Sequence, residues 1–112
     1  MCLFCQIVSG KIPSDTVFED SELLAFRDIN PQAPVHILII PKKHIDSIAE
    51  VENEDAYLVG KISLLANKLA KEEGIAESGY RLVTNCRDNG GQLIKHLHFH
   101  LLGGRQLSGN LG

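Results

Sequence analysis

The sequence has no surplus of positive charge. Among its 112 residues, 11 Lys and Arg stand against 14 Asp and Glu, which gives a formal charge of -3 at neutral pH. Binding along a nucleic-acid backbone needs a clustered excess of Lys and Arg. We therefore expect no nucleic-acid partner, whereas one small anionic ligand remains open because it needs only a few local donors.

A long apolar run is also absent. The longest, "ILII", is far too short to span a bilayer, and the chain passes from Met1 into "CLFCQI" without a basic leader segment. Repeats, low-complexity tracts and linkers are missing as well. We expect one cytoplasmic domain over residues 1–112, with no membrane partner.

Cysteine is scarce, and its number is odd. Three cysteines cannot all pair, and two of them form the motif Cys2-x-x-Cys5, so a disulfide framework is not expected. Such a motif is typical of metal binding or of redox chemistry. A thioredoxin-like role is disfavoured because no strand precedes Cys2. Cys86 is interpreted as a loop thiol.

Short β-rich segments predict a sheet. "TVFED" and "ELLAFRD" are predicted strands around a turn, and residues 35–40, rich in branched side chains between prolines, predict a buried strand. Residues 80–85 and 93–102 predict two further strands, joined by the polar turn "CRDNGGQ". About five mostly antiparallel strands follow from this count.

One segment has helical periodicity instead. Its apolar residues at helical spacing are Leu58, Ile62, Leu65 and Leu69. They predict one long helix over 53–73, capped by Asn53 and ended by Gly74. With a short N-terminal helix or turn that carries the cysteines, the fold class is α+β, and the long helix packs on one face of the sheet.

The segment "KHLHFHLLGG" places three histidines, His96, His98 and His100, at alternate positions. On a strand, residues two apart share a face, so the three imidazoles point one way while Leu97 and Phe99 point into the core. A single strand histidine is usually a hydrogen-bonded core residue. Three in alternation favour a functional role, because each buried imidazole would need partners of its own.

All three imidazoles are poorly placed to share one ion. On a strand, the Cβ atoms of His96 and His100 would lie roughly 13 Å apart, whereas a zinc–nitrogen bond is about 2 Å long. We therefore expect a division of roles, in which an end histidine binds a metal with ligands from elsewhere. Cys2, Cys5 and His44 are the candidates, since two thiolates and two imidazoles complete the tetrahedral set of a structural zinc site.

The other two histidines are candidates for catalysis. In the nearby "NGGQ", Gly90 and Gly91 permit a backbone nest for an anion, although an ordinary hairpin turn has the same composition. A neutral imidazole beside an anion site is a nucleophile toward phosphorus and would form a phosphohistidine, and a second histidine would protonate the leaving amine. His36 is either a hydrogen-bonded core histidine or orients His98 and His100, and the two interpretations overlap.

The pattern His-x-His-x-His-x-x with apolar x resembles the histidine triad nucleotide-binding family, and the chain is similar to its Hint branch, the purine nucleoside phosphoramidases. Supporting segments are "VFEDSELLAFRDINPQAPVHILIIPKKHI", "GYRLVTN", "NGGQ" and "HLLGGRQ". The resemblance implies a five-stranded antiparallel sheet with a long helix, and a homodimer whose two sheets join. It also implies hydrolysis of a purine nucleoside 5'-phosphoramidate, or a related nucleotidyl bond, to the nucleoside monophosphate.

The same resemblance implies roles for single residues. His98 matches the nucleophile and His100 its partner near the scissile atom, while His96 and His36 match the supporting histidines. Cys2, Cys5, His44 and His96 match the zinc ligands of zinc-bearing bacterial members and of galactose-1-phosphate uridylyltransferases. The implied purine contacts are Phe4, Ile7, Ile12 and Phe26. The implied ribose and base contacts are Asp28 and Ile29. The implied phosphate or substrate contacts are Asn85, Gly91, Gln92 and Leu93.

Two departures from the animal members bear on specificity. Leu93 stands where a serine hydroxyl can contact the phosphate, so only the backbone N–H remains there, and the tail "QLSGNLG" lacks their tryptophan. Two other functions stay open: a non-catalytic, zinc-stabilised nucleotide-binding module, and a dinucleoside polyphosphate hydrolase or nucleotidyl transferase. A transferase is disfavoured because His100 stands where uridylyltransferases carry glutamine.

Overall fold

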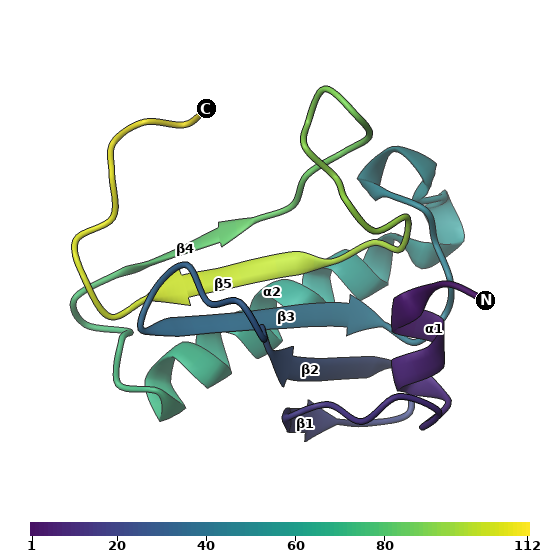
Figure 1. Ribbon diagram of the computed structural model, residues 1–112, viewed down its shortest axis with the longest axis horizontal. Helices are drawn as coiled ribbons and strands as arrows, with labels where there is room; N and C mark the ends of the chain where they lie inside the picture. Colours follow the sequence, from purple (N-terminus) through teal and green to yellow (C-terminus); the bar gives the residue numbers. More distant parts are fainter.

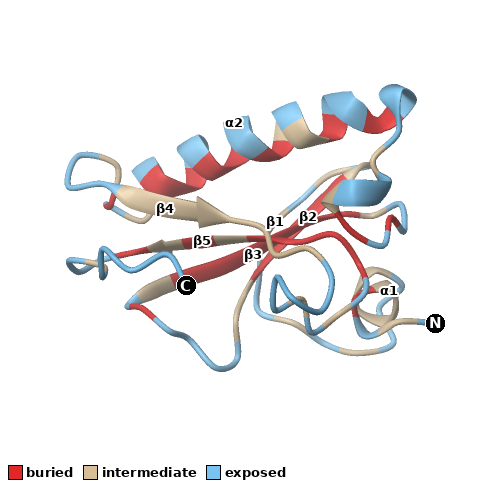
Figure 2. Ribbon diagram, turned by 90° about the horizontal axis from the view of Figure 1, so that it is seen from above, coloured by how far each residue is buried: buried red, intermediate tan, exposed pale blue.

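The computed structural model describes all 112 residues and contains one antiparallel sheet with a helix on each face (Figures 1 and 2). The five strands lie in the order β1-β2-β3-β5-β4. Their bounds are Thr16–Glu19 (β1), Leu23–Arg27 (β2), Val35–Pro41 (β3), Tyr80–Val83 (β4) and Phe99–Gly103 (β5). The predicted α+β fold is confirmed.

The long helix α2 (Ala56–Glu72) covers one sheet face, and the short helix α1 (Leu3–Val8) lies on the other (Figure 2). Central strands are therefore buried on both sides, which explains their unbroken apolar runs. In β2, Leu23 and Ala25 belong to the core cluster under α2, whereas Leu24 and Phe26 belong to the cluster that Phe4 of α1 joins. Neither helix combines the length and apolarity that a membrane crossing requires.

Helix α2 starts later than predicted and stops where predicted. Asn53 does not cap it, because Asn53–Asp55 forms a separate 3-10 turn (η2), and Asp55 takes the capping position of α2. A second 3-10 turn, η1, spans Ile48–Glu50. Gly74 takes a φ of +75°, and its N–H bonds to the carbonyl of Lys71. Glycine reaches this left-handed conformation without strain, so the predicted stop is confirmed.

The prediction of one strand over 93–102 is wrong at its start, because β5 begins only at Phe99. Extending the register between β3 and β5 would set Leu97 opposite Pro41, which has no N–H to give to the sheet. The N–H of Leu97 instead bonds to the carbonyl of Ile45 at 2.6 Å. His96 and His98 therefore precede the strand rather than lie within it. The prediction that Leu97 and Phe99 enter the core is confirmed.

Candidate active site and metal site

Three histidines meet on the sheet face that α2 leaves uncovered. His36 comes from β3, His100 from β5, and His98 from the residue just before β5. The Nε2 atom of His36 lies 2.9 Å from Nδ1 of His100, and the rings of His98 and His100 have centroids 5.1 Å apart. Phe4 packs edge-on against His98 with centroids 5.1 Å apart, so α1 closes one side of the group.

Hydrogen bonds to the backbone fix which nitrogens carry protons. The N–H of Gln32 donates to Nδ1 of His36 at 3.0 Å, so Nδ1 is an acceptor. The proton of neutral His36 therefore lies on Nε2, which donates to Nδ1 of His100. Nδ1 of His98 lies 2.7 Å from the carbonyl of His96 and must donate to it. His98 therefore keeps the lone pair of Nε2 free.

Burial keeps this group uncharged. It lowers the pKa of His98 below its ordinary value, and it lowers the pKa of His36, although the carboxylate of Asp28 counteracts the change there. For His100, burial and then the neighbouring His98 and His36 lower the pKa to about 4. All three imidazoles are therefore neutral near pH 7, and the neutral form is the one in which an imidazole can act as a nucleophile.

Two of the predicted polar contacts lie beside these histidines. Oδ2 of Asp28 is 3.4 Å from Nε2 of His36, and Oδ1 accepts the N–H of Asn30 at 2.8 Å. Asn85 lines a surface cavity of about 270 Å³ together with His36 and His100. The structure thus brings a carboxylate and an amide to the histidine group.

The predicted apolar contacts are spread over several places. Phe4 and Phe26 are buried in the small core cluster. Ile7 and Ile12 share a different surface cavity, of about 320 Å³, whose lining includes no histidine. Ile29, next to Asp28, is 92% exposed, so its side chain is accessible to a ligand.

The segment with Gly90 and Gly91 forms an ordinary turn. The N–H of Gly91 bonds to the carbonyl of Asp88, and the N–H of Gln92 to that of Arg87, so neither is available to an anion. Of the two interpretations of this segment, the ordinary turn is therefore the one that the structure has, and these two donors form no anion nest. Leu93, which follows, is 90% exposed.

A second group of side chains, Cys2, Cys5, His44 and His96, meets at the amino end of α1, and its ligand atoms all lie within 4.8 Å of one another. Both histidines turn Nδ1 toward the thiols, with sulfur–nitrogen distances between 3.3 and 3.6 Å. Burial raises the pKa of Cys2, but hydrogen bonds from Cys5 and His44 outweigh it, and the net pKa is lowered. This set could hold a metal ion, as the sequence predicts.

The far nitrogens of these two histidines have acceptors. Nε2 of His44 lies 2.6 Å from Oδ1 of Asp46, and Nε2 of His96 lies 2.8 Å from the carbonyl of Pro41. Both Nε2 atoms therefore carry the protons, which leaves both Nδ1 lone pairs directed at the thiols. Gln92 supports Asp46 in turn by donating to its backbone carbonyl at 2.6 Å.

Three supporting residues were not predicted from the sequence: Gln32, Asp46 and Thr84, whose hydroxyl donates to the carbonyl of His98 at 2.8 Å. Asp46 had a visible signal, a carboxylate two residues after His44 in "HID". Gln32 had none, because it acts through its backbone N–H.

The sequence model of the HIT domain matches residues 9–107. The chain belongs to the HIT domain family. It is 50% identical over 105 residues to the purine nucleoside phosphoramidase of Escherichia coli strain K12, covering 94% of this chain and 88% of that one. A HIT family hydrolase from Legionella pneumophila Philadelphia 1 superposes with a TM-score of 0.97 at 55% identity over 100% of both chains. A histidine triad protein from Clostridium difficile gives 0.94 at 47% identity, covering 97% and 95% of the two HIT chains.

Proposed function

We propose that this HIT protein hydrolyses purine nucleoside 5'-phosphoramidates, or related nucleotidyl conjugates, to the nucleoside monophosphate. The observation that carries this proposal is the orientation of His98, whose Nδ1 donates to the carbonyl of His96 while Nε2 stays free beside His100. The 50% identity to the Escherichia coli phosphoramidase supports the substrate class.

Two displacements at phosphorus account for the reaction. First, Nε2 of His98 forms a bond to phosphorus as the bond from phosphorus to the leaving nitrogen breaks, and that nitrogen takes a proton from the pair of His36 and His100. Water then forms a bond to phosphorus as the bond to Nε2 breaks, and its proton returns to the pair. The products are the free amine and the nucleoside monophosphate.

The proton donor must first gain a charge. His100 has a pKa of about 4, so it is neutral in the free protein and has no spare proton at pH 7. A bound phosphate anion raises that pKa, because an opposite charge at short range favours the imidazolium. Asp28, 3.4 Å from Nε2 of His36, stabilises the same positive charge. Substrate binding thus prepares its own acid.

The nucleotide is placed beside this group. Asp28 accepts hydrogen bonds from the ribose hydroxyls, exposed Ile29 gives apolar contact to the base, and Asn85 donates to the phosphate. The remaining predicted contacts are Phe4, Ile7, Ile12, Phe26 and Leu93, whereas Gly91 and Gln92 have their N–H groups bonded within the turn and are left out of the proposed contacts. An Asp28→Ala variant that binds AMP as tightly as the parent would show that the ribose contact is misassigned.

We propose that the second group is a structural zinc site held by Cys2, Cys5, His44 and His96. In a tetrahedral site with ordinary zinc bonds, sulfur and nitrogen ligands lie about 3.6 Å apart. The sulfur–nitrogen distances here, 3.3 to 3.6 Å, fit that spacing. Such an ion contributes folding free energy by joining α1 to two loops, and all four ligand positions are taken by the protein.

We also propose a homodimer. Strand β4 pairs only with β5, so its outer edge is open, and its four side chains are all half-buried. An open edge favours pairing with a second copy, which would join the two sheets. Sedimentation that shows only monomer at micromolar concentration would remove this support.

The function is tested by the release of a fluorescent amine from an adenosine phosphoramidate. Turnover with formation of AMP is the expected result. AMP binding without turnover would favour a non-catalytic binding module, and turnover restricted to dinucleoside polyphosphates would favour the alternative hydrolase. A panel of purine nucleotide conjugates then ranks the leaving groups.

A further inference from the structure

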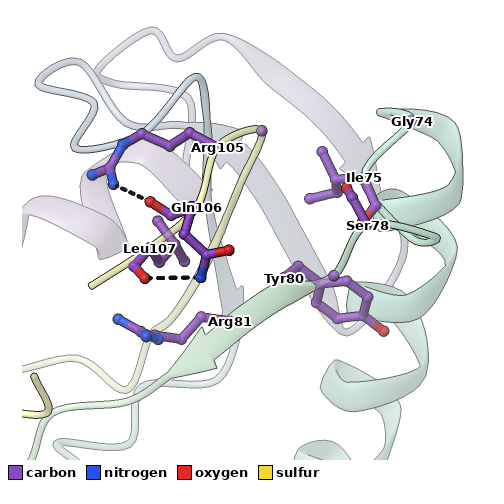
Figure 3. Close-up of a pocket in the computed structure, with 10 residues that line it drawn as sticks. Gly74, Ile75, Ser78, Tyr80, Arg81, Arg105, Gln106 and Leu107 are labelled. Atoms are coloured by element: carbon purple, nitrogen blue, oxygen red, sulfur yellow. Dashed lines mark hydrogen bonds between the residues drawn. The ribbon is translucent and has the colours of Figure 1, made fainter. Parts of the chain in front are cut away.

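The loop between β2 and β3 is held from outside by the segment that follows β5. Gly104 has a φ of +95°, and a Cβ atom there would lie 2.9 Å from Cβ of Pro34, so only glycine lets the two segments approach this closely. The next residue, Arg105, donates from Nη2 to the carbonyl of Gln32 at 2.9 Å. Its Nη1 donates to the carbonyl of Gln106 at 3.0 Å, as Figure 3 shows.

The two backbone groups of Gln32 face different partners. Its carbonyl accepts from Arg105, and its N–H donates to Nδ1 of His36. Because both groups flank one Cα atom, fixing the carbonyl restricts the direction of the N–H. The side chain adds a further restraint, since Nε2 of Gln32 donates to the carbonyl of Asn30 at 3.1 Å.

Resting on the proposed function, we infer that Arg105 is a positioning residue for the proton donor, acting through Gln32 and His36 on His100. The series of contacts is Arg105 to the Gln32 carbonyl, the Gln32 N–H to His36, and Nε2 of His36 to Nδ1 of His100 at 2.9 Å. Without Arg105, the N–H of Gln32 is free to turn away, and His36 can then move its proton to Nδ1. His100 would lose its donor and the orientation that places Nε2–H at the leaving group.

The test combines kinetics with histidine spectroscopy. For Arg105→Gln, we expect kcat for a phosphoramidate with a basic amine leaving group to fall on the order of 10-fold, since a small misplacement of an acid is costly. A substrate with a good leaving group should lose less than about 3-fold, and AMP affinity should stay within about 2-fold, because neither depends on the acid. Arg105→Lys, which keeps the charge and one donor, should recover part of the loss.

Side-chain ¹⁵N spectra provide a readout that does not need turnover. In the parent, Nδ1 of His36 should give the shift of an unprotonated nitrogen, and in Arg105→Gln this shift should move toward the protonated value. Gln106→Ala is the matched control. The exposed side chain of Gln106 donates only to the carbonyl of Leu107, and the substitution keeps the backbone carbonyl of residue 106 that accepts from Arg105.

Two outcomes would overturn the inference: an unchanged His36 tautomer in Arg105→Gln, or equal losses for good and poor leaving groups. If the parent itself releases no amine, the proposed function fails, whereas the spectra still decide whether Arg105 sets the tautomer.

Discussion

The two histidines beside the cysteines and His36 on strand β3 use the same side chain in opposite ways, and the difference lies in what the far ring nitrogen of each one meets. At the cysteines, Nε2 of His44 faces a carboxylate and Nε2 of His96 faces a carbonyl, so both Nδ1 lone pairs point at the thiols. In the other group, Nδ1 of His36 faces a backbone N–H, so its proton points at His100. An acceptor behind the ring leaves a lone pair on the near nitrogen, directed at the thiols in His44 and His96 and left free in His98, whereas the donor behind His36 turns its proton toward His100.

The same hydrogen bonds argue against a metal ion at a second group of candidate ligands. Asp28, His36 and His100 have ligand atoms within 4.8 Å of one another, as the cysteine group does. A metal bound to Nε2 of His36 would force the proton onto Nδ1, against the N–H of Gln32. The distances between ligand atoms do not distinguish the two groups as metal sites, whereas the hydrogen-bond partners of their histidines do.

The largest expected effect comes from replacing the nucleophile. His98→Asn should lower single-turnover rates by roughly 10⁴-fold or more, because no other group supplies the Nε2 lone pair. AMP affinity and metal content should stay near the parental values, since His98 belongs to one group only. Parental turnover in this variant would place the nucleophile elsewhere.

Removing a predicted zinc ligand should act on stability. His96→Ala should reduce bound zinc from about one equivalent to nearly none and lower the melting temperature by roughly 10 °C, because the lost ion contributes folding free energy. Elemental analysis and a thermal melt measure both. A full zinc equivalent with unchanged melting would contradict the assigned ligand set.

A smaller effect is expected from the carboxylate behind His44. Asp46→Asn keeps the size but weakens the acceptor for Nε2, so zinc affinity should fall about 10- to 100-fold by competition with a chelator. Asp88→Asn is the matched control, since Asp88 is also an exposed carboxylate but, unlike Asp46, does not face a nitrogen of a predicted zinc ligand. Equal affinities for the two variants would show that Asp46 does not orient the ligand.

The smallest effect concerns the pH dependence of the rate, whose acidic decline is expected at a lower pH than for an ordinary histidine. His98 attacks only when neutral, and burial lowers its pKa from the ordinary 6.5, so the neutral form persists as the pH falls below that value. Values of kcat/KM for a substrate with a good leaving group report the free protein, and they should stay level from pH 8 to about 6.5 and decline only below it. A midpoint at or above 6.5 would contradict the burial of the nucleophile.

The sequence predicted elements whose pattern is local and missed what depends on partners. Branched and aromatic residues between turn residues predicted the five strands, apart from the start of β5, helical spacing predicted α2, and Cys2-x-x-Cys5 led to the group of candidate metal ligands. The start of β5 was missed because it depends on Pro41, a residue on another strand. The turn at Gly90 and Gly91 was a correct alternative, but composition could not separate it from an anion nest. The tautomers of His36, His96 and His98 depend on backbone N–H and carbonyl groups, which are present at nearly every residue and so leave no pattern in the sequence.

His96 has a place in both groups at once. Its ring turns toward the thiols, while its backbone carbonyl holds Nδ1 of His98. The proposed metal site and the orientation of His98 thus share one residue. The predicted metal ligand is its side chain, which a substitution can remove, and the hydrogen-bond acceptor for His98 is its backbone carbonyl, which every substitution keeps. If the proposed zinc ion binds at this position, its loss would free the side chain of His96, which lies two residues before His98 in the sequence, and turnover is expected to decline together with zinc content.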